Sequence, residues 1–249
     1  MGTVTAYDDT FFASQRDGSL RSANVVVPLV NDLLAPRSVC DIGCGVGAWL
    51  RAWRDVGVED ICGVDGDYVN RSQLMVDERF FLRHDLRRAL PRTRTFDLVL
   101  SLEVAEHLPP DRAESFIAEL TLLAPAVLFS AAIPNQGGTC HINERWQDYW
   151  AELFEARGFS SFDVIRPLVW QDARVERWYR QNTILYCRDD LVSRCPGLSK
   201  VPASPLSLVH PKQYLERNHE YTVAESWTLL AGSLRRTGAR QFRKLLGKG

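Results

Sequence analysis

Residues 39–47 read Val-Cys-Asp-Ile-Gly-Cys-Gly-Val-Gly, and this stretch decides the fold. A short β-branched run, Ser38–Ile42, predicts a buried strand, and the alternating glycines after it predict a tight turn. Glycines let the backbone approach a ligand closely because no Cβ stands in the way. The pattern G-x-G-x-G differs from the G-x-G-x-x-G of dinucleotide-binding domains, and the preceding acid, Asp41, repels phosphate. The loop therefore predicts a ligand with a cationic group instead of a pyrophosphate.

Two further acids follow the next two predicted strands. Asp65 comes directly after Ile61–Val64, and Asp85 comes after Arg79–Arg83. Ligands of open α/β sheets bind outside the carboxyl ends of the strands, so the three acids are expected at one crevice. A carboxylate at Asp65 can accept hydrogen bonds from both hydroxyls of a ribose, and one at Asp85 can accept from an adenine amine. Strand-end acids also cap helices, but three in succession favour a ligand site.

Apolar runs alternate with helical patterns between residues 37 and 190, which predicts a doubly wound α/β domain with a mainly parallel sheet. Residues 1–36 are expected to form a helical lead-in, 37–190 the ligand-binding domain, and 191–249 a C-terminal extension with a basic tail. The extension opens on prolines and is expected to become helical from about Pro211. Further strands are predicted at Phe96–Leu102, Ala126–Ile133, Phe162–Leu168 and Thr183–Cys187, and helices at Ala48–Val56, Tyr68–Val76, Pro110–Leu123 and Arg145–Arg157.

Four segments together resemble the class I S-adenosylmethionine-dependent methyltransferases, namely Asp41-Ile-Gly-Cys-Gly-Val-Gly47, Gly63-Val-Asp65, His84-Asp-Leu86 and Phe96-Asp-Leu-Val-Leu-Ser-Leu-Glu103. The resemblance implies S-adenosylmethionine as cofactor. It also implies a Rossmann-like, seven-stranded sheet in the order 3-2-1-4-5-7-6, with an antiparallel seventh strand and helices on both faces. The residues that it implies for the cofactor are Asp41, Gly43, Gly45 and Gly47 at the methionyl part, Asp65 at the ribose, Asp85 and Leu86 at the adenine, and Ser101 and Glu103 at the sulfonium.

Candidate catalytic residues follow the fourth and fifth strands, as Glu103-Val-Ala-Glu106-His107 and His141. Both strand ends open on the same crevice, so the two histidines are expected to converge. Three hypotheses stay open. His107 or His141 can act as the general base for a hydroxyl acceptor. Alternatively, Glu103, Glu106, His107 and His141 can bind a divalent metal such as Mg, Mn or Zn, since their spacing resembles the metal site of small-RNA 3′-end 2′-O-methyltransferases. In the third hypothesis, Glu106 caps a helix and His107 packs under the cofactor.

Aromatic residues gather between positions 146 and 178. Trp146 and Trp150 share one predicted helix face, a spacing that is most often core. Aromatic faces beside amides also suit a sugar or another polyhydroxylated ring. Asn143, Trp146, Trp150 and Trp178 are therefore candidate substrate-binding residues. The segments around them resemble bacterial O-methyltransferases of glycan and natural-product biosynthesis.

Composition and charge narrow the function further. The net charge is −1, but residues 235–249 carry six cations and no acid, which leaves −1 − 6 = −7 for the rest. An acidic body is poor for nucleic acid, whose binding relies on phosphate contacts, so a small-molecule acceptor is expected. No apolar run reaches the length of a membrane span, and there is no secretory signal at the N-terminus. Six cysteines without CxxC spacing suggest reduced thiols in a cytoplasmic protein.

The sequence thus predicts a methyltransferase that O-methylates a small hydroxylated acceptor, such as a sugar or a natural product. Two alternatives stay open. One is a ribose 2′-O-methyltransferase acting on RNA 3′ ends with the Glu-Glu-His-His set. The other is a methyltransferase-fold module that binds S-adenosylmethionine without catalysis. The acceptor, the oligomeric state and the role of the basic tail are not predicted.

Overall fold

The computed structural model describes residues 9–91, 94–193, 195, 198 and 206–217, together with the single positions 223, 226, 227 and 230. The chain divides into two compact units, Met1–Gln213 and Tyr214–Gly249. Within the first unit the domain boundaries predicted at 36 and 190 stay a prediction. The basic tail at 235–249 and the prolines at 196, 202 and 205 lie outside the described residues. The helix predicted from about Pro211 begins there, as α8 (Pro211–Arg217).

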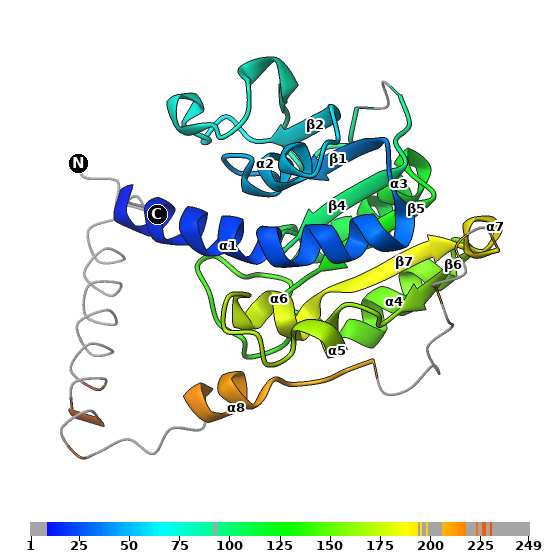
Figure 1. Ribbon diagram of the computed structural model, residues 1–249. Helices are drawn as coiled ribbons and strands as arrows, with labels where there is room; N and C mark the ends of the chain where they lie inside the picture. Colours follow the sequence, from blue (N-terminus) through cyan, green and yellow to red (C-terminus); the bar gives the residue numbers. More distant parts are fainter. Residues whose placement is uncertain are drawn as a thin grey trace. The chain divides into compact units, whose positions relative to one another are not determined.

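Seven strands form one sheet in the order β3-β2-β1-β4-β5-β7-β6, which confirms the predicted order (Figure 1). Strands β1 to β5 are all parallel, and β7 runs antiparallel to both β5 and β6. The carboxyl ends of the parallel strands therefore share one edge of the sheet. The strands are β1 (Ser38–Ile42), β2 (Asp60–Asp65), β3 (Phe81–Arg83), β4 (Leu98–Leu102), β5 (Ala126–Ser130), β6 (Phe159–Phe162) and β7 (Ile184–Arg188).

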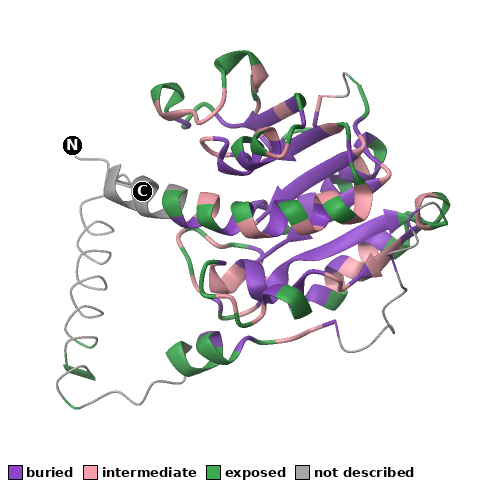
Figure 2. Cartoon of the chain, in the orientation of Figure 1, coloured by how far each residue is buried: buried purple, intermediate pink, exposed green. Residues whose placement is uncertain are grey.

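Helices cover both faces of this sheet, and the buried sheet lies between them (Figure 2). On one face, α1 (Asp9–Leu34), α2 (Ala48–Asp55), α5 (Arg166–Val169) and α6 (Arg177–Asn182) share a core with alternate strand residues. On the other face, α3 (Ala113–Leu123) and α4 (Gln147–Glu155) share a second core. A short helix, α7 (Asp189–Val192), follows β7.

Helix α1 is an integral part of the first core. Its residues Val26, Val27 and Val30 are fully buried. Burying one such side chain contributes about 1.5–3 kcal/mol, so the lead-in helix stabilises the domain and is held firmly along it. Among the described helices, none combines the length and the apolar character that crossing a membrane requires.

Two predicted elements are wrong. The helix predicted at Tyr68–Val76 is a series of turns with one 3-10 turn, η1 (Arg71–Gln73). The side chain of Asn70 accepts a hydrogen bond from the backbone N–H of Ser72 at 3.1 Å, and such local bonds compete with an α-helix. The backbone N–H of Met75 donates to Val46 at 2.8 Å, which ties the segment to the glycine loop.

The strand predicted at Phe162–Leu168 lies earlier in the chain, as β6 (Phe159–Phe162). Gly158 ends the preceding helix with a φ of 77°, so the strand begins directly after it. Pro167 lies in the first turn of α5, where its missing N–H costs nothing. Arg166, 1% exposed, donates to Asp163 at 2.6 Å and fixes the bend between strand and helix.

Candidate functional site

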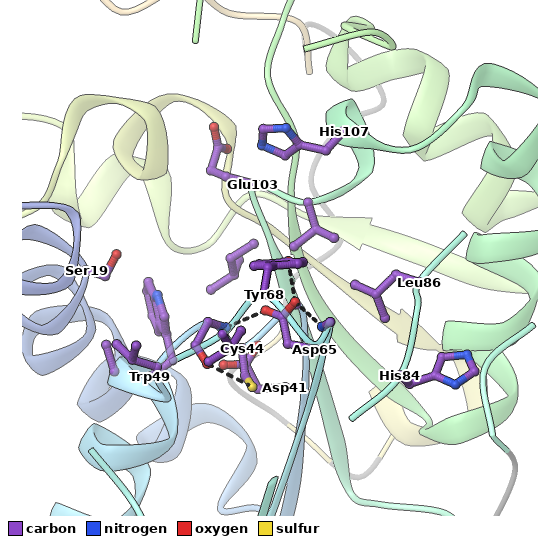
Figure 3. A pocket seen from close by; sticks show the side chains of 18 of the residues that line it. Ser19, Asp41, Cys44, Trp49, Asp65, Tyr68, His84, Leu86, Glu103 and His107 are labelled. Atoms are coloured by element: carbon purple, nitrogen blue, oxygen red, sulfur yellow. Dashed lines mark hydrogen bonds between the residues drawn. The ribbon is translucent and has the colours of Figure 1, made fainter. Parts of the chain in front are cut away.

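A cleft of about 1230 Å³ opens at the carboxyl ends of β1, β2 and β4 (Figure 3). Its walls come from the glycine loop after β1, the segments after β2, β3 and β4, and helices α1 and α6. The predicted residues that line it are Asp41, Gly43, Gly45, Asp65, Asp85, Leu86, Glu103, His107 and Trp178. The remaining predicted residues lie outside its lining and are taken up below.

The glycine loop adopts a left-handed backbone that favours glycine. Gly43 has a φ of 87°, and its N–H donates to Val64 at 2.8 Å. A Cβ at Gly43 would lie 2.3 Å from a methyl group of Val104, so close that either the Val104 side chain or the backbone would have to move. Gly45 has a φ of 52° with open space around its α-carbon, and Gly47, at 83°, precedes the first turn of α2 without lining the cleft. The loop therefore offers bare backbone to a ligand.

Asp41 lies buried at the base of the cleft with an unused acceptor. The residue is 2% exposed, and its Oδ2 has no hydrogen-bond partner among the described residues. Burial, together with the nearby charge of Asp65, raises the pKa of Asp41 to about 8. A buried carboxyl group in this state favours a cationic or hydrogen-bond-donating ligand.

Asp65 ends β2 with both carboxylate oxygens facing donors. Oδ2 accepts from the N–H of Gly45 at 2.6 Å, and Oδ1 accepts from the N–H of Gly66 at 2.6 Å. Oδ1 also accepts from the hydroxyl of Tyr68 (Figure 3). Burial raises the pKa of Asp65, while these three hydrogen bonds oppose the rise.

Asp85 and Leu86 line the cleft from the segment that follows β3. Asp85 forms a two-pronged pair with the Arg87 guanidinium, at 2.9 Å from Nε and 2.9 Å from Nη2. This pair lowers the pKa of Asp85 to about 2. Leu86 is buried and gives this end of the cleft an apolar surface. Asp85 is thus ionised but already partnered, and an adenine amine would have to share it with Arg87.

Glu103 directs its carboxylate into the cleft (Figure 3). Its φ of 56° is unusual for a residue other than glycine. The amide of Gln136 donates to Oε2 at 2.8 Å, and that of Asn182 donates to Oε1 at 3.1 Å. Burial raises the pKa of Glu103, and the amide hydrogen bonds oppose the rise. Ser101, also predicted to face the sulfonium, is instead fully buried in β4 and does not line the cleft.

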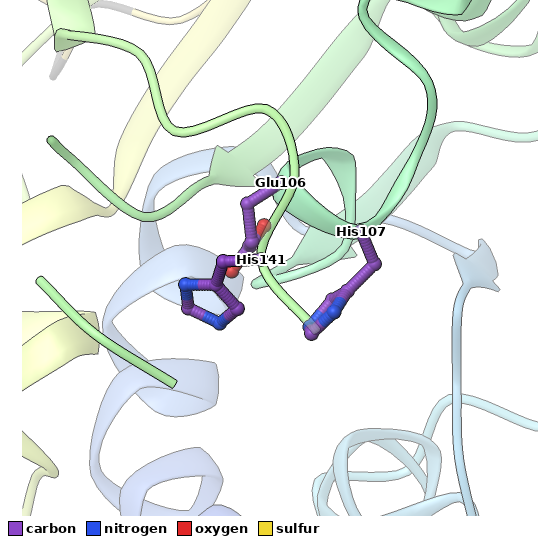
Figure 4. Close-up of side chains that lie close together, drawn as sticks. All are labelled: Glu106, His107 and His141. Atoms are coloured by element: carbon purple, nitrogen blue, oxygen red, sulfur yellow. The ribbon is translucent and has the colours of Figure 1, made fainter. Parts of the chain in front are cut away.

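The two predicted histidines do converge (Figure 4). The ring centroids of His107 and His141 lie 4.8 Å apart, edge to face. Glu106 lies beside them, and one potential ligand atom from each of the three residues lies within 4.8 Å of the others. Glu103 is absent from this group, so the predicted four-residue metal set reduces to three residues. Only His107 of the three lines the cleft.

Electrostatics within this group are unusual. Both carboxylate oxygens of Glu106 are buried without a hydrogen-bond partner among the described residues, and burial beside Glu103 raises its pKa well above the ordinary value. Burial and the nearby His141 lower the pKa of His107 to about 4. His107 is therefore neutral at neutral pH. A neutral imidazole can accept a proton or bind a metal ion.

Glu144 is a functional candidate that sequence reasoning missed. It accepts from Nδ1 of His141 at 3.0 Å and from the backbone N–H groups of Asn135 and Gly137, at 2.8 and 3.2 Å. A carboxylate on one ring nitrogen fixes the orientation of a histidine and leaves its other nitrogen for a proton or a metal. The i, i+3 spacing of His141 and Glu144 is the one local signal that could have found it.

Of the four predicted substrate-binding residues, only Trp178 lines the cleft. Trp150 is 2% exposed in the core, with its ring centroid 5.3 Å from that of Phe129, so the core interpretation of its helical spacing holds. Trp146 is exposed, and Asn143 is buried against the backbone of Ala105. These three residues lie outside the cleft lining.

Two further cleft residues were not assigned from the sequence. Ser19, from α1, and Tyr179, from α6, share a 3.1 Å hydrogen bond at the cleft wall. Trp49 packs edge-on against Tyr179, with ring centroids 5.1 Å apart. No local pattern distinguishes Ser19, since only the packing of α1 brings it to the cleft.

Comparisons with known proteins agree with this geometry. A family model described as a methyltransferase domain matches residues 12–171. No curated protein sequence matches the chain. A solved magnesium protoporphyrin IX methyltransferase from Synechocystis PCC 6803 with bound SAH is 21% identical, with a TM-score of 0.52, and the match covers 76% of this chain and 90% of that one.

Two solved O-methyltransferase-type structures are also similar. A putative O-methyltransferase from Nostoc punctiforme is 18% identical, with a TM-score of 0.54 and coverage of 75% of this chain and 64% of that one. An O-methyltransferase family protein from Burkholderia thailandensis is 15% identical, with a TM-score of 0.53 and coverage of 74% and 60%. The chain spans less than two thirds of the length of these two proteins, and at these identities the likeness concerns the fold.

Proposed function

The chain belongs to the methyltransferase domain family, and on this premise we propose that it O-methylates a small hydroxylated acceptor, such as a sugar or a natural product, with S-adenosylmethionine as the methyl donor. The observation that carries the proposal is the buried Asp41 carboxyl group at the base of a large cleft, whose Oδ2 has no hydrogen-bond partner within the described part of the chain. A cytoplasmic location is part of the same proposal.

The cleft residues fit this cofactor. Asp41 and the bare backbone at Gly43 and Gly45 would hold the cationic methionyl part, because an unpaired buried carboxyl group favours an ammonium partner. Asp65 would accept from the ribose, and Leu86 would pack on the adenine. When bound, S-adenosylmethionine supplies an electrophilic methyl group on its sulfonium.

The acceptor side of the cleft offers a base and a hydrogen-bond acceptor. His107 lines the cleft and can take the proton that the acceptor hydroxyl loses as its oxygen attacks the methyl group, although its lowered pKa makes it a weaker base than an ordinary histidine. Glu103, held by Gln136 and Asn182, can accept a hydrogen bond from a second hydroxyl and so orient the acceptor. Trp178 adds an aromatic wall of the kind that packs on a sugar ring. Correct placement of the attacking oxygen supplies much of the rate of a displacement reaction.

A divalent metal is a finer part of the proposal. Glu106, His107 and His141 provide one carboxylate and two imidazoles, a donor set suited to Mn or Zn more than to Mg. The two unpartnered oxygens of Glu106 fit an ion, since a buried carboxylate is otherwise costly. Glu144 would orient His141 from behind. If a metal ion is held in this way, His107 is one of its ligands and does not act as the general base.

The same group of three residues favours a second candidate function, ribose 2′-O-methylation at RNA 3′ ends. The acidic body argues against it, because RNA binding relies on contacts between cationic side chains and phosphates. Incubation with labelled S-adenosylmethionine, an RNA panel and a panel of glycosides decides between the two. Methyl transfer to RNA 3′ ends, with none to the glycosides, refutes the small-acceptor proposal.

Cofactor binding is the first test of the proposed function. We expect S-adenosylhomocysteine to bind in isothermal titration calorimetry, and Asp65→Ala to weaken binding at least tenfold, because a hydrogen bond to a charged group contributes about 1.5–3 kcal/mol. The matched control is Asp55→Asn, on the exposed face of α2 where Asp55 pairs with Arg51. No binding to the native chain, or equal weakening in both variants, refutes the proposal.

Metal binding has its own test. Elemental analysis and titration with Mn²⁺ or Zn²⁺ after EDTA treatment should show an ion bound to the native chain and lost in Glu106→Gln. The exposed Glu114→Gln on α3 is the matched control. If EDTA leaves methyl transfer unchanged and no ion binds, the metal part is wrong. Loss of turnover in His141→Ala with retained cofactor binding excludes a non-catalytic module.

A further inference from the structure

The hydroxyl of Tyr68 occupies a hydrogen-bond acceptor position on Asp65 that the ribose of the proposed cofactor needs. Its hydroxyl donates to Oδ1 of Asp65, at the end of β2 (Figure 3). An ionised carboxylate offers about four lone-pair positions. Three are filled, by the N–H of Gly45, the N–H of Gly66 and the hydroxyl of Tyr68. One position is therefore left, whereas a ribose presents two hydroxyls.

The ring of Tyr68 is placed so that it can leave. It is 69% exposed although it lines the cleft, so most of the ring is in contact with solvent. It lies directly over Gly66, where an added Cβ would come 2.4 Å from a ring carbon. Only glycine at this position lets the ring fold back onto the carboxylate three residues earlier. The turns that replace the predicted helix after β2 make this return possible.

We propose that Tyr68 is a specificity-determining residue of the cofactor site, whose hydroxyl stands in for one ribose hydroxyl on Asp65 until a nucleoside with both hydroxyls displaces it. The inference rests on the proposed function. A phenol and a ribose hydroxyl are equivalent donors to a carboxylate, so Asp65 stays satisfied in both states. The buried carboxylate is thus never left unpaired, and ligands without a ribose diol gain nothing from the exchange.

The test is the affinity for S-adenosylhomocysteine, measured by isothermal titration calorimetry. Tyr68→Phe removes the competing hydroxyl, and we expect it to bind roughly tenfold more tightly, the equivalent of one charge-assisted hydrogen bond. Tyr149→Phe removes a hydroxyl outside the cleft lining and is expected to bind like the native chain. Unchanged or weaker binding by Tyr68→Phe overturns the proposal.

A second measurement follows Tyr68 in the native sequence and uses the variant only to assign the signal. Biosynthetic labelling with 3-fluorotyrosine gives a ¹⁹F resonance for Tyr68, assigned by its absence in Tyr68→Phe. Adenosine and S-adenosylhomocysteine should both shift it, and methionine, which lacks a ribose, should not. A resonance that ignores adenosine overturns the proposal while cofactor binding stands. Absence of any binding by the native chain instead refutes the proposed function.

Discussion

Cofactor binding should release a proton from Asp41. This carboxyl group is buried, and none of the residues that the structure describes donates a hydrogen bond to its Oδ2. Burial together with the nearby Asp65 raises its pKa to about 8. At pH 7 about 0.9 of the molecules therefore carry the proton in the empty cleft. An ammonium group in contact with the carboxylate favours the charged form and returns the pKa towards its ordinary value. Binding then expels about 0.9 proton per site.

The sign of the pH dependence follows from this release. Because binding expels a proton, a higher pH favours binding, and the apparent affinity should rise about fivefold between pH 7 and pH 8. The gain levels off above pH 8, where Asp41 is already ionised in the empty protein. For the empty protein alone, the same raised pKa makes folding less favourable as the pH rises from about 4 to 8.

Calorimetry in two buffers measures the release directly. Titrations of S-adenosylhomocysteine in phosphate and in Tris differ in observed enthalpy by the number of protons released times the difference in buffer ionisation enthalpy. We expect about 0.9 proton at pH 7 and about 0.5 at pH 8, where the α-amino group of the ligand is still protonated. Asp41→Asn should release close to none at pH 7 or pH 8 and bind at least tenfold more weakly at pH 8, whereas Asp55→Asn should match the native chain. A release at pH 7 that is zero, or that survives in Asp41→Asn, would falsify the assignment.

Three further predictions concern stability and the glycine loop. Trp150→Ala should lower the free energy of unfolding, measured by urea denaturation, by about 3–5 kcal/mol, because the ring fills the core. The affinity for S-adenosylhomocysteine should not change, since the ring does not line the cleft. A lower affinity under conditions where the variant is fully folded contradicts this. Gly43→Ala should abolish detectable binding of S-adenosylhomocysteine, since the added Cβ meets Val104 and the backbone has a φ of 87°. Adding Val104→Ala should restore the stability of this variant only in part, because the backbone strain stays. Native-like binding by Gly43→Ala refutes the steric argument. In metal-free protein, His107 should titrate near pH 4 when followed by NMR. Because its pKa in the folded protein lies below the unfolded value of about 6.5, its protonation destabilises the fold as the pH falls from about 6.5 to 4. His107→Asn should remove this pH dependence.

Local chemistry determined much of the fold and the cofactor half of the site. The alternation of apolar runs and helical patterns is a property of neighbouring residues, so it predicted a mainly parallel sheet from the sequence, while the order of the strands followed from the resemblance to a known family. The glycine loop and the strand-end acids could be placed because parallel strands bring their carboxyl ends to one edge. Asp41, Asp65 and Asp85 accordingly line one cleft, as expected.

Long-range packing decided the rest. Within one five-residue segment, Glu103 faces the cleft while Glu106 turns into a buried group with His141, because amides from Gln136 and Asn182 capture the first carboxylate. Those amides lie 33 and 79 residues away in the chain, so no local spacing predicts them.

The same limit explains the misplaced elements and aromatic residues. The helical spacing that includes Trp150 fits both a core position and a ligand wall, and only the packing against Phe129 decides between them. The sequence pattern predicted that Tyr68 belongs to a helix. In the structure its ring folds back because its hydroxyl donates a hydrogen bond to the buried carboxylate of Asp65. The sequence by itself determined which residue types meet at the edge of the sheet. Tertiary structure decided which of their side chains are left without a partner, because burial and pairing depend on groups that only the folded chain brings together.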